Sequence, residues 1–292
     1  MWRKYLKERQ HQVEEMIQNL VPAQEGPLAQ MAESMRYSLL AGGKRLRPAL
    51  LTAAADAVGA DGTKFLQSAC ALEMIHTYSL IHDDLPAMDN DDYRRGRLTN
   101  HRVYGDGMAV LAGDGLLTLA FQTLLSQPGT PIAVLGLVAR EVAEAAGPAG
   151  MVGGQAIDLG AEGKRLSLED LKLMHRLKTG ALFRASLRAG AMLAGGSDDD
   201  VQALTEYAEH FGLAFQITDD ILDVSGDSAT LGKSVGSDEK KRKATYVSLY
   251  SLTEARQMAD AAVKSAVAAL GRFGDSAAVL RSLAEYLPTR EN

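Results

Sequence analysis

The sequence predicts an all-α protein in which one large helical bundle forms a single domain over residues 1–292. Only 8 prolines occur, and residues 149–287 contain none, which is difficult to reconcile with many strands and turns. In residues 204–222, apolar side chains recur at the three- and four-residue steps of one helical face. No proline-rich linker separates halves of different composition. We therefore expect the helices to pack together around one core.

Glycine-containing breaks divide the chain into about ten expected helices. The breaks fall at residues 42–43, 59–62, 105–107, 195–196 and 226–236. Residues 1–21 mix charges with spaced apolar residues and lack the apolar stretch of a signal peptide. Residues 64–82 are apolar at most positions, so this segment is expected to be a deeply buried helix.

Composition excludes several classes of protein. The 31 Lys and Arg against 37 Asp and Glu leave a net charge of −6, which argues against general attraction to nucleic acid. The longest purely apolar stretch, residues 132–139, is far shorter than the roughly 20 residues of a membrane span, so none is expected. The single cysteine, Cys70, excludes an internal disulfide and favours a reducing, cytoplasmic location.

Two acidic clusters are the strongest functional signals. Asp219 and Asp223 are one turn apart in the periodic helix, on a face that continues an apolar row, and Gln216 and Asp220 lie beside them. Such carboxylates point toward an interior cavity. Two of them 4 Å apart repel by about 4 kcal/mol at an effective dielectric near 20, so they require either a counter-cation or a strongly raised pKa. Ligation by oxygen atoms favours Mg²⁺.

The second cluster contains Asp83, Asp84 and Asp89 and follows the apolar segment of residues 64–82. Asp83 and Asp89 are about 120° out of alignment on an ideal helix. Pro86 is therefore expected to accompany a kink or a helix end that turns Asp89 back. Either cluster alone could equally be a solvated helix end or a weak Ca²⁺ loop, and the acidic run at 198–200 is explained by helix capping.

Basic residues suited to phosphate stand near these clusters. Lys44 and Arg47 follow a glycine pair, and Arg94 and Arg95 follow the first acidic run. The spacing is not that of a Walker loop. Each group alone could be a helix cap or a surface charge, and their co-occurrence is what favours a site for phosphorylated substrates.

In this order of motifs the chain resembles the trans-isoprenyl diphosphate synthases, with a close match to the short-chain bacterial farnesyl diphosphate synthases. The motifs are Gly-Gly-Lys-Arg-Leu-Arg-Pro at 42–48, the run from Ser-Leu-Ile-His-Asp-Asp to Tyr-Arg-Arg-Gly at 79–96, Gly-Gly-Gln-Ala-Ile-Asp-Leu at 153–159, Lys-Thr-Gly at 178–180 and Phe-Gln-Ile-Thr-Asp-Asp-Ile-Leu-Asp at 215–223. The resemblance implies the isoprenoid synthase bundle with a central active-site cavity, usually as a homodimer.

The resemblance also implies a role for each matching residue. The diphosphate of isopentenyl diphosphate would be held by Gly43, Lys44, Arg47, His76 and Arg95. The allylic diphosphate would be contacted by Arg94, Lys178, Thr179, Gln216 and Lys233. Three Mg²⁺, with Mn²⁺ as a substitute, would be held by Asp83, Asp84, Asp89, Asp219, Asp220 and Asp223. Among all these residues, the resemblance implies catalytic roles for Asp83, Asp84, Asp89, Arg94, Lys178 and Asp219.

Product length depends on the helix before Asp83. Ideal helical geometry places Ser79 and Ile75 directly beneath Asp83, whereas the resemblance points to Tyr78 as the chain-length residue. An aromatic side chain there resembles enzymes that stop at fifteen carbons, so (2E,6E)-farnesyl diphosphate is the expected product. The alternatives are a geranylgeranyl or geranyl diphosphate synthase, a class I terpene cyclase and a silent helical subunit. Both acidic motifs are intact, which argues against the last two.

Overall fold

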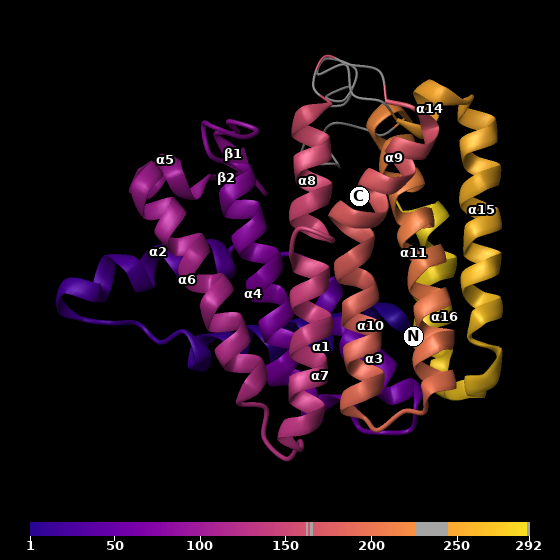
Figure 1. Cartoon of the computed structure of the whole chain (residues 1–292), viewed down its shortest axis with the longest axis horizontal. Helices are drawn as coiled ribbons and strands as arrows, with labels where there is room; N and C mark the ends of the chain where they lie inside the picture. The colour runs from indigo at the N-terminus through magenta and orange to yellow at the C-terminus, as the bar shows by residue number, and fades with distance from the viewer. Residues whose placement is uncertain (162, 164–165, 226–244, 291–292) are drawn as a thin grey trace.

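The chain is almost entirely α-helical in this computed structural model, which describes residues 1–161, 163, 166–225 and 245–290 (Figure 1). The all-α prediction is confirmed. The helices are, in order, α1 (Trp2–Leu20), α2 (Ala29–Leu39), α3 (Leu46–Ala57), α4 (Leu66–Asp83), α5 (Asn100–Tyr104), α6 (Asp106–Leu125), α7 (Ile132–Ala146), α8 (Met151–Gly160), α9 (Leu168–His175), α10 (Ala181–Leu193), α11 (Asp198–Ser225), α14 (Tyr246–Leu249), α15 (Leu252–Ala269) and α16 (Ala278–Tyr286). Short 3-10 turns cover Gly26–Leu28, Gly62–Phe65, Gly271–Ala277 and Leu287–Thr289, and Arg176–Gly180 form a π-helix between α9 and α10.

The two long helices expected from the sequence are both present. Residues 204–222 lie within α11, and residues 64–82 correspond to α4, whose side chains are buried at most positions. The predicted glycine break at 105–107 falls between α5 and α6, but glycine punctuation did not separate α14 from α15. It also missed a small antiparallel hairpin, β1 (Tyr93–Arg94) and β2 (Arg97–Leu98). Positive φ angles of 53° at Arg95 and 74° at Gly96 form its tight turn.

Helix α10 lies in the middle of the bundle and packs against α3, α7 and α11 (Figure 1). Its buried residue Phe183 meets two rings of α11 edge to face, with centroids 5.5 Å from Phe211 and 5.1 Å from Phe215. Gly190 allows close approach to α3, because a Cβ there would overlap the backbone carbonyl of Leu51. On the outer side, α15 packs along α11.

Helices α4 and α11 end on the same side of the bundle, at the top of Figure 1. The π-helix above α10 and the β1–β2 hairpin lie at this end as well. The acidic motifs at the ends of α4 and α11 are thereby brought to one region of the molecule. The fold thus supports the expectation that they serve one site.

Helix α6 packs against α4 and is apolar. Within the described residues it is the one helix that is long and apolar enough to cross a membrane by length and composition, with 39% of its most apolar window buried. Core helices of soluble proteins meet the same criterion. The longest uninterrupted apolar run lies in α7, at residues 132–139. The apolar residues of α6 did not form such a run because Asp106 and Asp114 stand among them.

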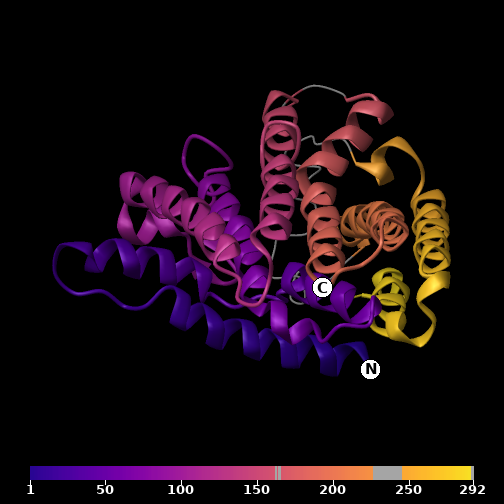
Figure 2. The ribbon, with the colours of Figure 1, turned by 60° about the horizontal axis from the view of Figure 1, so that its bottom comes forward.

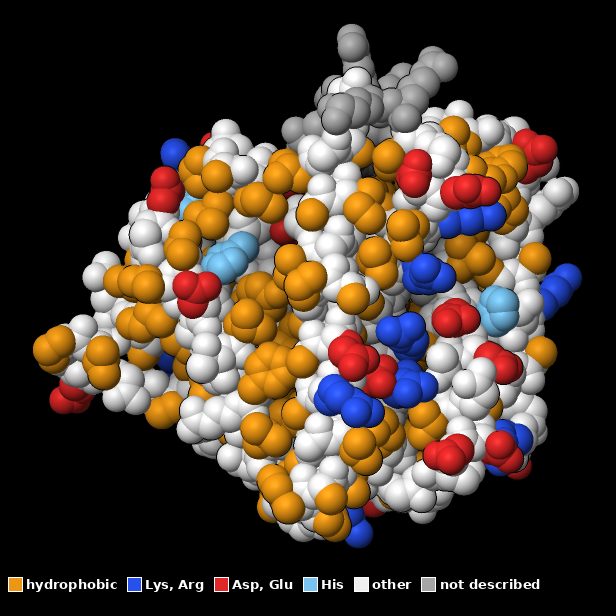
Figure 3. Space-filling view, in the orientation of Figure 1, with side chains coloured by type: hydrophobic (Ala, Val, Ile, Leu, Met, Phe, Trp, Pro, Cys, Tyr) orange, Lys and Arg blue, Asp and Glu red, His pale blue; other side chains and the backbone are white. Residues whose placement is uncertain are grey.

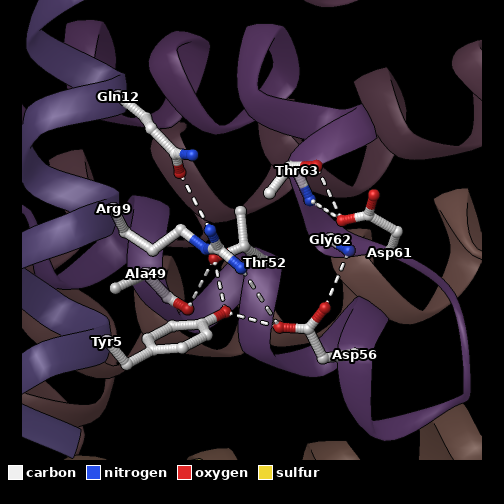
Figure 4. Close-up of polar contacts among 9 residues, drawn as sticks. All are labelled: Tyr5, Arg9, Gln12, Ala49, Thr52, Asp56, Asp61, Gly62 and Thr63. Atoms are coloured by element: carbon white, nitrogen blue, oxygen red, sulfur yellow. Dashed lines mark hydrogen bonds and ion pairs between the residues drawn. The ribbon is translucent and has the colours of Figure 1, made fainter.

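Helix α1 begins near α16 and crosses one side of the bundle (Figure 2). Trp2 contacts Tyr286 with ring centroids 4.1 Å apart. In the first half of α1, Tyr5 and Arg9 reach α3 in a polar cluster (Figure 4). The Tyr5 hydroxyl donates to Asp56 Oδ2 at 2.7 Å and lies 2.9 Å from Thr52 Oγ1. This cluster fixes α1 against the helix that begins with the basic motif.

We expect Tyr5→Phe to lower the free energy of unfolding by about 1 kcal/mol, because it removes the hydroxyl that Asp56 accepts from. Urea denaturation followed by circular dichroism measures the change. Tyr93→Phe is the control, since Tyr93 is 67% exposed. Equal stability of Tyr5→Phe and wild type would contradict a stabilising role for the cluster.

Candidate active site

The first acidic cluster lies where α4 ends. The helix stops at Asp83, and the chain turns through Pro86 so that the backbone N–H of Asp89 donates to the Asp83 carbonyl at 2.8 Å. Asn90, with φ of 52°, completes the turn. The prediction that a helix end near Pro86 brings Asp89 back to Asp83 is therefore confirmed.

Burial governs the charge of these carboxyls. Burial raises the pKa of Asp83 to about 6, against the opposing effect of Lys178, and nearby Asp89 adds to the rise. Asp84 is 3% exposed and also has a raised pKa because of burial. The Arg94 guanidinium donates hydrogen bonds to the Asp84 carboxylate. Its Nε lies 2.9 Å from each carboxylate oxygen, and its Nη2 lies 2.6 Å from Oδ1.

The second acidic cluster lies near the end of α11. The Gln216 amide donates to Asp219 at 3.3 Å, and the guanidinium of Arg290 forms an ion pair with the same carboxylate. Arg290 also lies over the ring of Phe215, 4.3 Å from its centroid. Asp220 is turned to a different neighbour and accepts a hydrogen bond of 2.7 Å from the backbone N–H of Tyr246.

The chemistry of the donors fits Mg²⁺. Both clusters offer carboxylate oxygens, the ligands that this ion prefers. Within the described part of the chain, no three acidic, histidine or cysteine side chains gather closely enough to hold a metal ion. Arg94 on Asp84 and Arg290 on Asp219 occupy two of the carboxylates instead. Metal roles for Asp83, Asp84, Asp89, Asp219, Asp220 and Asp223 stay predictions.

A basic region is built around the start of α3. Gly42 and Gly43 have φ of 80° and 129°, angles that favour glycine. A Cβ at Gly43 would overlap the guanidinium of Arg95, which donates to the carbonyl of Gly42. The glycine pair therefore allows the hairpin arginine to approach Lys44 and its neighbours closely.

Arg45 is a structural residue within this basic run. It has φ of 47°, is 2% exposed, and forms an ion pair of 2.8 Å with buried Glu73 of α4. A second hydrogen bond of 2.7 Å runs from Arg45 to the carbonyl of Leu39. This pair fixes the loop before α3 to α4.

Cations crowd the expected isopentenyl diphosphate subsite. Burial lowers the pKa of Arg47 to about 10, and its guanidinium lies 4.9 Å from the ring centroid of Phe183. Partial burial and then the charge of Arg290 lower the pKa of Lys44. Burial, followed by Arg47 and Arg95, lowers the pKa of His76 well below its usual value, which keeps the imidazole neutral at pH 7. The region thus has excess positive charge suited to an anion.

Arg94 and Arg95 also line a small cavity of about 40 Å³ between α2, α4 and the hairpin, with Asp84 and Thr77 on its α4 side. A cavity of this size has room for two or three waters. It is too small for a prenyl diphosphate.

Lys178 and Thr179 lie in the π-helix of Arg176–Gly180. The Lys178 ammonium is 2.6 Å from Asp158 Oδ2 of α8, and it is close enough to Asp83 to lower the pKa of that carboxyl. Lys178 is thus brought to the first acidic cluster, as expected for a residue that contacts the allylic diphosphate.

The two chain-length residues differ in their surroundings. Tyr78 is 6% exposed, and its ring meets His82 edge to face with centroids 5.7 Å apart. Burial, and then the charge of Asp83, raise the pKa of Tyr78 to about 12. The Ser79 hydroxyl instead donates to the carbonyl of His76 on its own helix at 2.9 Å. Lys233, in the predicted loop of residues 226–243, lies outside the described residues.

Sequence reasoning missed two charged residues that contact the site. Arg290 belongs to none of the five motifs. Its contact with the site is visible only in the folded structure, where it forms an ion pair with Asp219 near the end of α11. Asp158 lies inside the motif at 153–159 but received no role. Its spacing four residues after Gly154 is the signal that could have placed it on the same helical face.

The raised pKa of Asp83 predicts a pH-dependent stability. Folded Asp83 binds its proton more tightly than the unfolded chain does, so its stabilising contribution is present at low pH and is lost as pH rises from 3.8 through about 6. We expect Asp83→Asn in metal-free buffer to be more stable than wild type by about 1–2 kcal/mol at about pH 7.5, with little difference near about pH 4.

Chemical denaturation at the two pH values measures this difference. Asp260→Asn, at an exposed position of α15, controls for the loss of one negative charge. A stability gain for Asp83→Asn that is the same at both pH values would contradict the proposed cause.

Relatives and solved structures share this site-bearing fold over nearly its whole length. A farnesyl diphosphate synthase from Geobacillus stearothermophilus is 47% identical over 290 residues, which cover 99% of this chain and 97% of that protein. A geranylgeranyl diphosphate synthase from Cyanophora paradoxa is 45% identical over 290 residues, covering 99% and 96% of the two chains. The apo crystal structure of an FPP/GFPP synthase from Zymomonas mobilis matches with a TM-score of 0.89 at 39% identity and covers 98% of both chains.

The sequence pattern of one protein family extends across most of the chain. The family described as polyprenyl synthetase matches residues 29–285, a range that includes both acidic clusters and all five motifs. The expectation drawn from those motifs is confirmed. This chain belongs to the polyprenyl synthetase family.

Proposed function

We propose that this chain is a short-chain prenyltransferase that condenses isopentenyl diphosphate head to tail with dimethylallyl or geranyl diphosphate to give (2E,6E)-farnesyl diphosphate. The observation that carries the proposal is the turn after α4, which brings Asp83 and Asp89 together beside Lys178 and next to Arg94 and Arg95. Family membership and the similarity to farnesyl diphosphate synthases support the same reaction.

The basic residues divide between the two substrates. Arg47 and Arg95 lie close to neutral His76 and, together with Lys44, suit the diphosphate of isopentenyl diphosphate. Lys178 and Arg94 lie at the acidic cluster of α4 and suit the allylic diphosphate. The neutral imidazole adds a hydrogen-bond partner without further repulsion among the arginines.

The reaction begins when the allylic C–O bond breaks and diphosphate departs with the electron pair. Lys178 and Arg94 stabilise the negative charge that develops on the leaving group. The Thr179 hydroxyl and the Gln216 amide present oxygen dipoles to the allylic cation. The double bond of isopentenyl diphosphate then attacks, a proton is lost to the departed diphosphate, and a new double bond forms. No side chain acts as nucleophile.

The carboxylates at the ends of α4 and α11 would hold Mg²⁺, which would supply further neutralisation of the leaving diphosphate. The acidic residues hold and orient this charge. The raised pKa of Asp83 reflects burial of a carboxyl beside Asp89, and a divalent cation favours its charged form. The proposal includes three Mg²⁺, with Mn²⁺ as a substitute.

We extend the proposal to a homodimer in the cytoplasm. Apolar side chains gather on one face over α6 and α7 (Figure 3). Leu111 of α6 is 53% exposed and Ile132 and Leu137 of α7 are 72% and 47% exposed, the kind of surface that a second copy covers. Buried Cys70 is consistent with a reducing compartment.

The purified chain with Mg²⁺, isopentenyl diphosphate and dimethylallyl diphosphate is expected to release farnesyl diphosphate. Asp219→Asn should lower kcat by about 100-fold or more, because one anionic ligand of the leaving-group site is lost. Asp198→Asn, in the capping run at the start of α11, is the matched control and should retain wild-type turnover. Hydrocarbon products, or an inactive wild-type chain, would overturn the proposal.

Tyr78 is expected to limit the product to fifteen carbons. Tyr78→Ala removes the buried ring that stands on α4 before Asp83, so the prenyl tail gains room and products shift toward twenty carbons. Chromatography of the dephosphorylated products measures the shift. Ser79→Ala is the comparison, since its hydroxyl is bound to its own helix. A shift in Ser79→Ala without one in Tyr78→Ala would reverse the assignment.

A further inference from the structure

The motif at residues 153–159 lies on α8, directly against the π-helix that carries Lys178. The one charged residue of this motif, Asp158, forms an ion pair of 2.6 Å with Lys178. The two side chains are only 12% and 26% exposed, so the pair is shielded from water. Neither the acidic clusters nor the basic region described above uses this carboxylate.

The backbones of α8 and the π-helix are in close contact at Gly154. A Cβ at this position would overlap the backbone nitrogen of Lys178. Asp158 follows Gly154 by one helical turn and therefore extends from the same face of α8. The close approach places the carboxylate within reach of the Lys178 ammonium.

The positively charged Lys178 lies between two carboxyl groups, those of Asp158 and Asp83. Its ammonium contacts Asp158, and its charge also lowers the pKa of Asp83 on α4. An ammonium has three N–H donors, so the bond to Asp158 leaves two for an anionic ligand. A lysine side chain loses up to about 2 kcal/mol of rotamer entropy when fixed in one orientation. Because the ion pair with Asp158 already fixes the Lys178 side chain, less rotamer entropy is lost when a ligand binds.

We propose that Asp158 is a positioning residue, which holds the Lys178 ammonium at the edge of the acidic site in the orientation that meets the allylic diphosphate. The inference rests on the proposed function and deepens it. Asp158 acts through Lys178 and does not touch substrate. Gly154 is part of the same device because it allows α8 to approach the π-helix.

The test compares variants that change the charge of the pair. Asp158→Asn should raise KM for the allylic diphosphate about tenfold and leave KM for isopentenyl diphosphate within about twofold of wild type. The reason is that the proposal assigns Lys178 to the allylic diphosphate alone. Asp158→Glu retains the charge and should recover much of the affinity. Glu141→Gln is the matched control. It removes the ion pair between Glu141 of α7 and Arg188 of α10, which has a distance of 2.8 Å and is buried to a similar extent as the Asp158–Lys178 pair. Its KM values should equal those of wild type.

Binding of inorganic diphosphate with Mg²⁺, followed by calorimetry, separates positioning from general damage. Asp158→Asn should weaken this binding about tenfold in the wild-type background and leave it unchanged in Lys178→Met, where no ammonium remains to be positioned. The double variant contains no unpaired buried charge at this pair and is the form most certain to fold. Equal weakening in both backgrounds, or none in either, would overturn the proposal. A wild-type chain that binds diphosphate but forms no prenyl product contradicts the proposed function instead, and the binding comparison still tests Asp158.

Discussion

The carboxylates at the ends of α4 and α11 depend on cationic side chains that other parts of the chain bring to them. Two carboxylates at 4 Å repel by about 4 kcal/mol at an effective dielectric near 20, and burial adds to that cost. The hairpin contributes Arg94 to Asp84, the π-helix contributes Lys178 near Asp83, and the segment after α16 contributes Arg290 to Asp219. Much of the arrangement of helices at this end therefore serves charge balance.

The rest of the bundle provides the rigidity that such a site requires. Helix α4 is buried along most of its length, and its Glu73 holds Arg45 so that the basic loop stays in place. Helix α10 extends from the π-helix into the centre of the core, where Phe183 packs against α11 and beneath Arg47. Substrate groups are thus positioned by elements that the hydrophobic core fixes on several sides.

The sequence predicted those features that depend on local periodicity and spacing. Apolar steps located α11 and α4, and the six-residue separation of Asp83 and Asp89 required the turn at Pro86. Contacts between distant segments were not predictable in this way. The pairing of Arg290 with Asp219 and of Arg45 with Glu73 depends on tertiary packing, which no local pattern records.

Short elements also escaped prediction for a physical reason. The hairpin at Arg94 and the helix α14 are too brief to show a period, and their conformations depend on the neighbours they contact. The orientation of Asp220 toward Tyr246 likewise follows from the position of α14. The single domain over residues 1–292 and the role of Lys233 stay predictions.

The π-helix at Arg176–Gly180 also bears on how this chain tolerates changes of length during evolution. A π-helix holds an extra residue within an otherwise regular helix. Because the wider turn absorbs that residue, deleting one residue there would leave a regular α-helix, with α10 in nearly the same orientation and Phe183 still against α11. The deletion would instead remove the widened turn that carries Lys178 and Thr179. A change of length at this point therefore alters the site and leaves the packing of the core largely in place.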